Sequence, residues 1–231
     1  RDGKSLKLAV LDLPSFYGGS EGTRHCVEDV KALLREVRAG GAQGLVLDLS
    51  RNGGGLLKAS VDISGFFIAE GPVVAIDGPA TPAQVLEDTD DGIAYAGPLV
   101  VLISRGSASA SEILAGALKD YDRAIIVGDT QTFGKGTGQN IVRLPPGFGA
   151  LKVTTAMFFR PSGQSTQSAG VQADVVIPSL YDRDEYAEKK KLFALDTRSI
   201  TPFEGKSVRG SGRDAWRPLD AATIDTLRQK S

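Results

Sequence analysis

Three glycine- or serine-rich segments of this 231-residue chain carry side chains that could attack or polarise a carbonyl group. The first is GSASASE, Gly106–Glu112, which lies between a short apolar run and an amphipathic stretch. A serine at the start of a helix can be a nucleophile, because the unpaired N–H groups and the positive end of the helix can hold an oxyanion. The same serines could simply cap the helix, and the segment alone does not decide between these roles.

The second segment is TFGKGTGQ, residues 132–139, in which glycines flank Lys135. A lysine in such a loop is usually a solvated surface residue. Desolvation by Phe133 and the nearby core would instead favour the neutral amine, which can act as a base. A Ser-Lys pair needs that neutral form, because an ammonium group cannot take up the proton of the serine.

The third segment is DLSRNGGG, residues 48–55, which follows a short apolar run typical of a buried strand. Its glycines suit a tight turn whose N–H groups face a ligand. An ordinary tight turn is the simpler interpretation of the same residues.

Lys135 does not fit a phosphate-binding loop. That motif has four residues between its two glycines and a serine or threonine directly after the lysine. Here five residues separate Gly128 from Gly134, and Gly136 follows the lysine. We therefore expect no nucleotide binding and no cofactor.

His25 is the single histidine, and it lies at the start of a predicted helix, outside all three segments. We expect it to be a surface or capping residue, so lysine is the better candidate base for an activated serine. One histidine and one cysteine, adjacent in sequence, do not form a metal-ligand set, and no metal site is expected. Because Cys26 is the single cysteine, an internal disulfide is excluded.

In their order and spacing, three stretches resemble the C-terminal processing (tail-specific) peptidases. They are LVLDLSRNGGG at 45–55, PLVVLISRGSASASEILAGALKDYDRAIIVGDTQTFGKGTGQ at 98–139 and STQSAGVQADVVIP at 165–178. The resemblance implies a serine peptidase with a Ser-Lys dyad and an α/β fold, the crotonase/Clp-like ββα-superhelix core.

The resemblance also assigns roles to individual residues. It implies that Ser109 is the nucleophile, that Lys135 is its base and that Gln139 supports the lysine.

The oxyanion donors follow from the same resemblance. They would be the N–H of Ala110 and the N–H of one glycine of the NGGG turn, and the sequence does not choose between Gly53 and Gly54.

Neighbouring polar residues are expected to be structural. Ser107 and Ser111 lie two residues either side of Ser109 and would point in other directions around a strand-to-helix turn. Asp120 follows Ser109 by about three helical turns, or ~16 Å, so we expect no contact with the serine and a pairing with Arg123.

Gly138 stands where the family usually has a β-branched apolar residue, which predicts a looser lysine loop. Four glycines between residues 128 and 138 also predict a segment that is easy to move and costly to order.

Strand-like and helix-like stretches alternate through the first two-thirds of the chain, which predicts an α/β core with a mainly parallel sheet. A polar surface loop is expected at 79–97. The sequence predicts strands at 6–13, 44–49, 72–76, 98–103 and 124–127, a hairpin of 140–144 with 150–159, and helices at 24–39, at 56–68 and directly after Ser109.

The composition is that of a soluble globular protein, with 41% hydrophobic residues, 24% charged residues and a net charge of −1. Because the net charge is close to zero, we expect no long-range electrostatic attraction to nucleic acid or anionic membranes. The apolar runs are too short to span a bilayer. We expect a catalytic core at 1–180 and a charged appendage or cap at 181–231 with a late helix near 219–229. The chain begins at Arg1 without an initiator Met, so a mature form or a fragment is expected, and residues 1–43 are too short for the PDZ module that usually precedes this core.

These expectations describe a serine endopeptidase that cleaves proteins near their C-termini and takes protein or peptide substrates with apolar C-termini. The resemblance implies an extracytoplasmic setting, such as the bacterial periplasm. A catalytically silent peptide-binding module of the same fold and a lipid or small-ester hydrolase are the alternatives. The sequence does not predict an oligomeric state.

Overall fold

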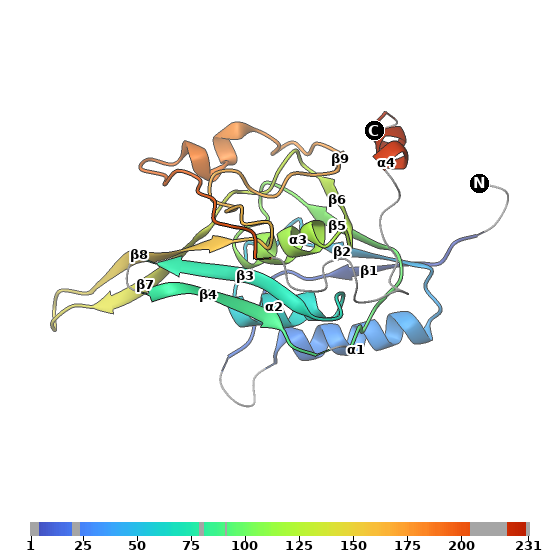
Figure 1. Ribbon diagram of the computed structural model, residues 1–231, viewed down its shortest axis with the longest axis horizontal. Coiled ribbons are helices and arrows are strands. Elements are labelled where there is room, and N and C mark those ends of the chain that lie inside the picture. The colour runs from blue at the N-terminus through green and yellow to red at the C-terminus, as the bar shows by residue number, and fades with distance from the viewer. Residues whose placement is uncertain (1–4, 20–23, 79–80, 91, 204–220, 230–231) are drawn as a thin grey trace.

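The computed structural model describes residues 5–19, 24–78, 81–90, 92–203 and 221–229. Within them, two sheets and the helices packed against them form a mixed α/β fold, which confirms the predicted fold class (Figure 1).

Five strands of the described residues form a parallel sheet in the order β1-β2-β5-β6-β9. Its central strands β2 and β5 are apolar runs because both faces of the sheet are covered, and Leu47, Leu99 and Val101 are fully buried. The strands are β1 (Leu8–Asp12), β2 (Gly44–Asp48), β5 (Leu99–Ile103), β6 (Ile125–Gly128) and β9 (Val175–Val176).

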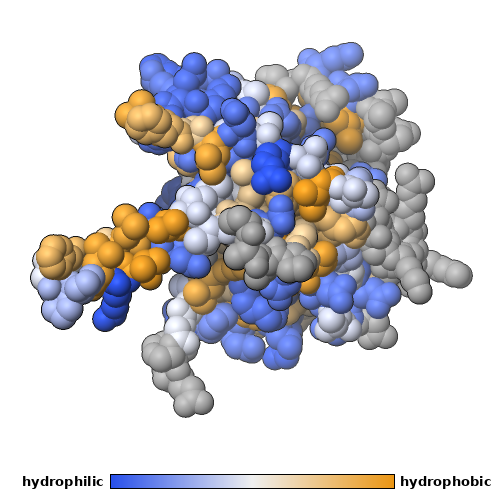
Figure 2. Space-filling view, turned by 60° about the vertical axis from the view of Figure 1, so that its left-hand side comes forward, coloured by the Kyte–Doolittle hydropathy of each residue, from blue (hydrophilic) through white to orange (hydrophobic). Residues whose placement is uncertain are grey.

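Four strands form a second, antiparallel sheet of the described residues in the order β4-β3-β8-β7. The predicted hairpin is present as β7 and β8, and its outer part projects from the body of the molecule (Figures 1 and 2). The strands are β3 (Gly71–Gly78), β4 (Thr81–Asp88), β7 (Thr137–Arg143) and β8 (Ala150–Phe159). The projecting part exposes the apolar side chains of Ile141, Val142, Leu144, Phe148 and Leu151.

Strand β4 lies where the sequence predicts a surface loop, so that prediction is wrong. β4 is the edge of its sheet, and most of its described side chains are exposed. A polar composition is compatible with such a strand, because an edge strand pairs on one side and has few side chains to bury.

Helix α3 (Ala110–Asp120) lies between the two sheets, in contact with β6 of one and β3 of the other (Figure 1). Its residues Leu114 and Leu118 are fully buried in the shared core. Two further helices, α1 (Cys26–Ala39) and α2 (Leu57–Gly65), pack against each other, and α2 also packs against α3.

Beyond β9, the described chain forms two short 3-10 helices, η1 (Asp184–Tyr186) and η2 (Glu188–Lys190), and then α4 (Ala221–Arg228). Helix α4 confirms the predicted late helix, whereas the boundary at residue 180 stays a prediction. No helix of the described residues combines the length and the apolar character needed to cross a membrane.

Candidate active site

Ser109 occupies the turn between β5 and α3, at the N-cap position of the helix. Its backbone has φ 59° and ψ −114°, a conformation that a residue with a side chain adopts only at a cost. The side chain is partly exposed. Strained, part-exposed residues of this kind are concentrated at functional sites, because the surrounding structure must hold them in place.

The two neighbouring serines have structural roles, as predicted. The Ser107 hydroxyl donates to Leu49 O at 2.7 Å, and the Ser111 hydroxyl donates to Asn52 O at 2.7 Å. Both serines are fully buried. They therefore bind the segment around Ser109 to the turn after β2, and neither hydroxyl is available to a substrate.

Asn52 holds that turn from the inside and is itself fully buried. Its amide nitrogen donates to Leu13 O at 2.8 Å, and its side-chain oxygen accepts from Gly54 N at 2.9 Å. Its carbonyl oxygen also accepts from Ala108 N at 3.1 Å. Asn52 thus joins the residue after β1 and the glycine turn through its side chain, and the segment that precedes Ser109 through its backbone.

Gly54 packs directly against Ser109. A Cβ atom on Gly54 would lie 2.9 Å from Ala108 O and from Ser109 Cβ, and its φ is +108°. Glycine is required here both by the close approach and by the backbone conformation. At Gly53, by contrast, a Cβ atom would meet nothing within 4 Å.

The two glycines also differ in their N–H groups. Gly54 N–H donates to the side chain of Asn52. Gly54 is nevertheless close to Ala110, since a Cβ atom on Gly54 would lie 3.2 Å from Ala110 N. Among the described residues, no partner accepts from the N–H of Gly53 or of Ala110. Gly54 therefore lies closer to Ser109 and Ala110, whereas Gly53 has the N–H group that, within the described chain, is free to bind an oxyanion. The choice of oxyanion donor between the two glycines stays open.

A buried carboxylate that the sequence analysis did not single out connects the serine and lysine segments. Glu112 is fully buried, and one of its oxygens accepts from Ser109 N and from Lys135 N, each at 2.8 Å. Its other oxygen accepts from Thr132 Oγ1 at 2.5 Å and from Gly134 N at 2.7 Å. The backbone nitrogens of Ser109 and Lys135 therefore lie within two hydrogen-bond lengths of each other.

Burial raises the pKa of Glu112 to about 7, although the four donors act in the opposite direction. A carboxylate whose partners all donate is best satisfied when it is ionised. Glu112 stands three residues after the N-cap serine, which is the capping-box position, and this spacing is the signal that could have identified it.

The lysine loop is held more tightly than the sequence predicts. Besides the bonds of Gly134 and Lys135 to Glu112, Gly136 N donates to Gln167 Oε1 at 3.0 Å. A Cβ atom on Gly136 would lie 2.3 Å from Gln167 N, so the loop packs closely against the segment around residue 167. Its glycines serve this close packing, and the expectation of a loose loop is not met.

Gly138 lies in strand β7 and not in the loop. A Cβ atom there would meet the Phe158 ring at 3.2 Å, so little room exists for the β-branched residue usual in the family.

Glu112 brings the backbone of Ser109 close to that of Lys135, but their side chains are not bonded to each other. Lys135 is partly buried. In the described part of the chain, no hydrogen bond joins the Lys135 amine to the Ser109 hydroxyl. The Gln139 amide donates to Thr137 Oγ1 at 3.0 Å, so Gln139 is placed at the start of β7, next to the lysine loop.

Asp120 is structural, as predicted, but its expected partner was wrong. Its carboxylate binds the guanidinium of Arg160, with Nε at 3.2 Å from Oδ2, and also accepts from Ser162 N. Arg123 instead donates to backbone carbonyl oxygens, including those of Phe67 and Tyr95. Asp120 therefore connects the end of α3 to the segment after β8.

His25 caps α1, as predicted, because its Nδ1 accepts from Val27 N at 3.3 Å. Within the described residues, no group of three His, Cys, Asp or Glu side chains could hold a metal ion.

Several known proteins are similar to this chain. The profile of peptidase family S41 matches residues 7–177. The chain is 44% identical over 195 residues to a tail-specific protease of Haemophilus influenzae, covering 81% of this chain and 27% of that protein. It is 36% identical over 222 residues to a carboxy-terminal-processing protease of Bartonella bacilliformis, covering 94% of this chain and 51% of that protein.

A solved structure is also similar. It is the photosystem II D1 C-terminal processing protease, with a TM-score of 0.65 and 36% identity, and the match covers 73% of this chain and 42% of that one. The chain thus spans about half or less of the length of these relatives.

Proposed function

Because the chain belongs to peptidase family S41, we propose that it is the catalytic core of a serine endopeptidase that cleaves proteins near their C-termini through Ser109 and Lys135. The observation that carries this proposal is the Glu112 carboxylate, which accepts from the N–H groups of both residues. A shared buried acceptor fixes the two segments relative to each other before a substrate binds, and such preorganisation is what a dyad requires.

The mechanism begins with the neutral amine of Lys135. The amine takes the proton of the Ser109 hydroxyl as the serine oxygen bonds to the scissile carbonyl carbon. The carbonyl electron pair moves onto oxygen and forms a tetrahedral oxyanion. The lysine then gives its proton to the leaving amine, the carbon–nitrogen bond breaks, and the acyl-enzyme remains.

Water completes the cycle by the same route. Lys135 takes a proton from the water as its oxygen attacks the acyl carbon, and the proton then returns to Ser109 as the ester bond breaks. The N–H of Ala110 and the N–H of Gly53 or Gly54 stabilise the oxyanion during both acylation and deacylation. No cofactor or metal ion takes part in these steps.

Gln139 supports the lysine in this proposal. Its amide nitrogen donates a hydrogen bond to Thr137 Oγ1. Its side-chain oxygen can therefore accept a hydrogen bond from the Lys135 amine. This contact would guide the amine toward Ser109 when a substrate is bound.

The substrates we propose are unfolded protein or peptide tails with apolar C-termini, and the setting we propose is extracytoplasmic, such as the bacterial periplasm. Cell fractionation of the native host would test the setting. The names of the relatives support C-terminal processing as the reaction class.

Cleavage of an unstructured protein with an apolar C-terminus tests the proposal. The parent chain should shorten this protein from its C-terminal end, and Ser109→Ala and Lys135→Ala should not, although both variants keep the parental circular dichroism spectrum. Full activity of Lys135→Ala would contradict the dyad. Binding without cleavage by the folded parent would favour a catalytically silent peptide-binding module.

A further inference from the structure

A pocket of about 400 Å³ opens at the carboxyl ends of β2 and β5, on the edge of the parallel sheet where Ser109 also lies. One part of its lining consists of Ser50, Ser104, Arg105, Gly106 and Phe133. The rest of the lining comes from the segment 181–191, which the sequence predicts to be a charged appendage or cap.

Two lining residues of the pocket lie close in sequence to the proposed catalytic residues. Gly106 precedes Ser109 by three residues, and Phe133 precedes Lys135 by two. Phe133 N donates to Ser107 O at 3.0 Å, which binds these two parts of the lining to each other. A polypeptide whose carbonyl carbon is at Ser109 therefore has a neighbouring residue within reach of this pocket.

Three aromatic side chains, Phe133, Tyr181 and Tyr186, contribute to the lining. Tyr181 and Tyr186 pack edge to face, with ring centroids 5.8 Å apart and an interplanar angle of 72°. The Lys191 amine lies 6.0 Å from the centroid of the Phe133 ring. The lining has three charged residues, Arg105, Glu185 and Lys191. Arg105 is paired with Asp182, and Glu185 and Lys191 have opposite signs, so little unpaired charge is left to select an ionic ligand.

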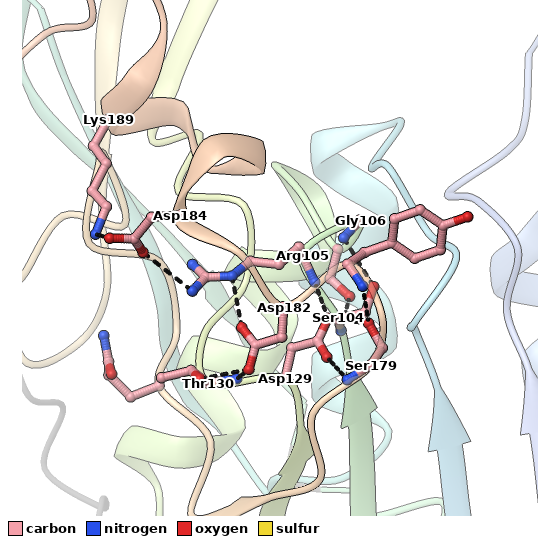
Figure 3. Close-up of polar contacts among 12 residues, drawn as sticks. Ser104, Arg105, Gly106, Asp129, Thr130, Ser179, Asp182, Asp184 and Lys189 are labelled. Atoms are coloured by element: carbon pink, nitrogen blue, oxygen red, sulfur yellow. Dashed lines mark hydrogen bonds and ion pairs between the residues drawn. The ribbon is translucent and has the colours of Figure 1, made fainter.

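A buried ion pair fixes the wall that the segment 181–191 supplies (Figure 3). Arg105 Nε lies 3.0 Å from Asp182 Oδ1, and both side chains are 5% exposed. The other oxygen of Asp182 accepts from Thr130 N at 2.9 Å and from its hydroxyl at 2.6 Å. Because contacts within the protein hold this wall in place, the pocket is preformed and loses little entropy when it is filled.

We propose that this pocket is a substrate subsite that binds an apolar or aromatic side chain of the polypeptide beside the bond to be cleaved. The inference rests on the proposed function, because it assigns a polypeptide as the occupant. It also gives the segment 181–191 a role in substrate selection, which a simple appendage would not have.

Equilibrium binding to the inactive Ser109→Ala protein tests the subsite without chemistry. Unstructured fluorescent peptides would carry leucine, phenylalanine or aspartate at one guest position, and the guest position would be moved along the peptide. At one position, leucine and phenylalanine should bind about tenfold more tightly than aspartate, as expected for burying one apolar side chain.

Two variants alter the pocket from opposite sides. Gly106→Leu would fill it, since a Cβ atom there meets its nearest atoms, Ser104 Oγ and Ser50 O, at 3.3 Å and needs only a small adjustment. Tyr186→Ala would remove part of the aromatic wall. Each should abolish the preference, whereas Phe193→Ala, an 89% exposed aromatic residue outside the lining, should keep it.

The outcomes separate the subsite from the catalytic proposal. No guest preference in Ser109→Ala, or a preference that survives both pocket variants, would overturn the subsite. A preference lost in both variants, together with a Ser109-containing parent that cleaves nothing, would keep the subsite and contradict the proposed catalysis.

Discussion

Two buried side chains that touch no substrate in the proposed mechanism, Asn52 and Glu112, set the geometry around Ser109. Asn52 holds the glycine turn, and Glu112 holds the serine and lysine segments together. Each of these polar groups is fully buried and accepts or donates at short range, so removing either leaves several backbone groups without partners.

The adjacent glycines provide a matched pair of variants at the residue scale. Gly54→Ala should lower kcat/KM by about 10²-fold, since its methyl group would push against Ser109 and its positive φ would be strained. Gly53→Ala should keep activity within about twofold, because its side chain enters open space and its N–H is retained. Steady-state kinetics on one peptide would measure both, and equal losses in the two variants would count against this geometry.

The pKa of Glu112 predicts a pH dependence of the rate. Because all four partners donate, protonation of the carboxyl as the pH falls through about 7 places its new proton against a donor and should disturb the site. The parent rate should therefore fall on the acid side of about pH 7. The mechanism also needs a neutral Lys135, so Glu112→Gln, which cannot ionise, should keep an acid limb that is shallower than that of the parent, and it should be slower by at least about tenfold at every pH.

The pH–rate profile of kcat/KM is the measurement, with thermal unfolding as the control for folding. A Glu112→Gln protein with the parental profile would show that Glu112 is a structural group alone.

At the scale of elements, the segment 181–191 is bound to the strand ends by Arg105 and Asp182 and not by an apolar core of its own. Asp182→Ala should leave the buried guanidinium poorly paired, lower the free energy of unfolding by about 2–4 kcal/mol and increase amide hydrogen exchange in this segment.

Asp184→Ala is the matched control for that change. Asp184 also contacts Arg105, but at 3.5 Å and with a 57% exposed side chain. It should leave hydrogen exchange in the segment close to that of the parent. Equal effects of the two variants would indicate that the buried pair does not hold the wall.

The end of strand β4 offers a pH-dependent stability test. Burial, with a smaller contribution from the Asp90 carboxylate, raises the pKa of Asp88 to about 6, and Asp88 Oδ2 is buried without a partner among the described residues. The protonated carboxyl is therefore favoured on folding, and the stability it contributes is present below about pH 4 and lost as the pH rises through about 6.

Asp88→Asn keeps a neutral side chain at every pH. Its free energy of unfolding should exceed that of the parent by about 1–2 kcal/mol at pH 8, a value reduced for the partial exposure of the site, and should match the parent at pH 4. Urea denaturation at the two pH values measures this, and a parent that is as stable as the variant at pH 8 would contradict it.

At the scale of the whole molecule, the elements with strong periodicity were predictable from the sequence. The buried strands β2 and β5 and the amphipathic helix α1 have ends within a few residues of the expected ones, because burial on both faces or on one stripe leaves a clear pattern. The edge strand β4 was not predictable, since its partner and not its composition makes it a strand.

The roles of Ser109, Lys135 and the glycine turn stay predictions, and they come from the order and spacing of three stretches that resemble the family, because each segment alone allowed a simpler interpretation. The supports of the site were less predictable. The lining supplied by Tyr181 and Tyr186 depends on long-range packing through Arg105, which no local pattern contains.

The most direct test of the central claim is covalent labelling of the protein with a fluorophosphonate, which reacts with an activated serine, followed by mass spectrometry of the peptides. We predict that the label is attached to Ser109 and not to the buried Ser107 or Ser111, and that Lys135→Ala lowers the labelling rate by about 10²-fold or more while the protein stays folded. A label on another residue, or an unchanged labelling rate in Lys135→Ala, would contradict the claim that Lys135 activates Ser109.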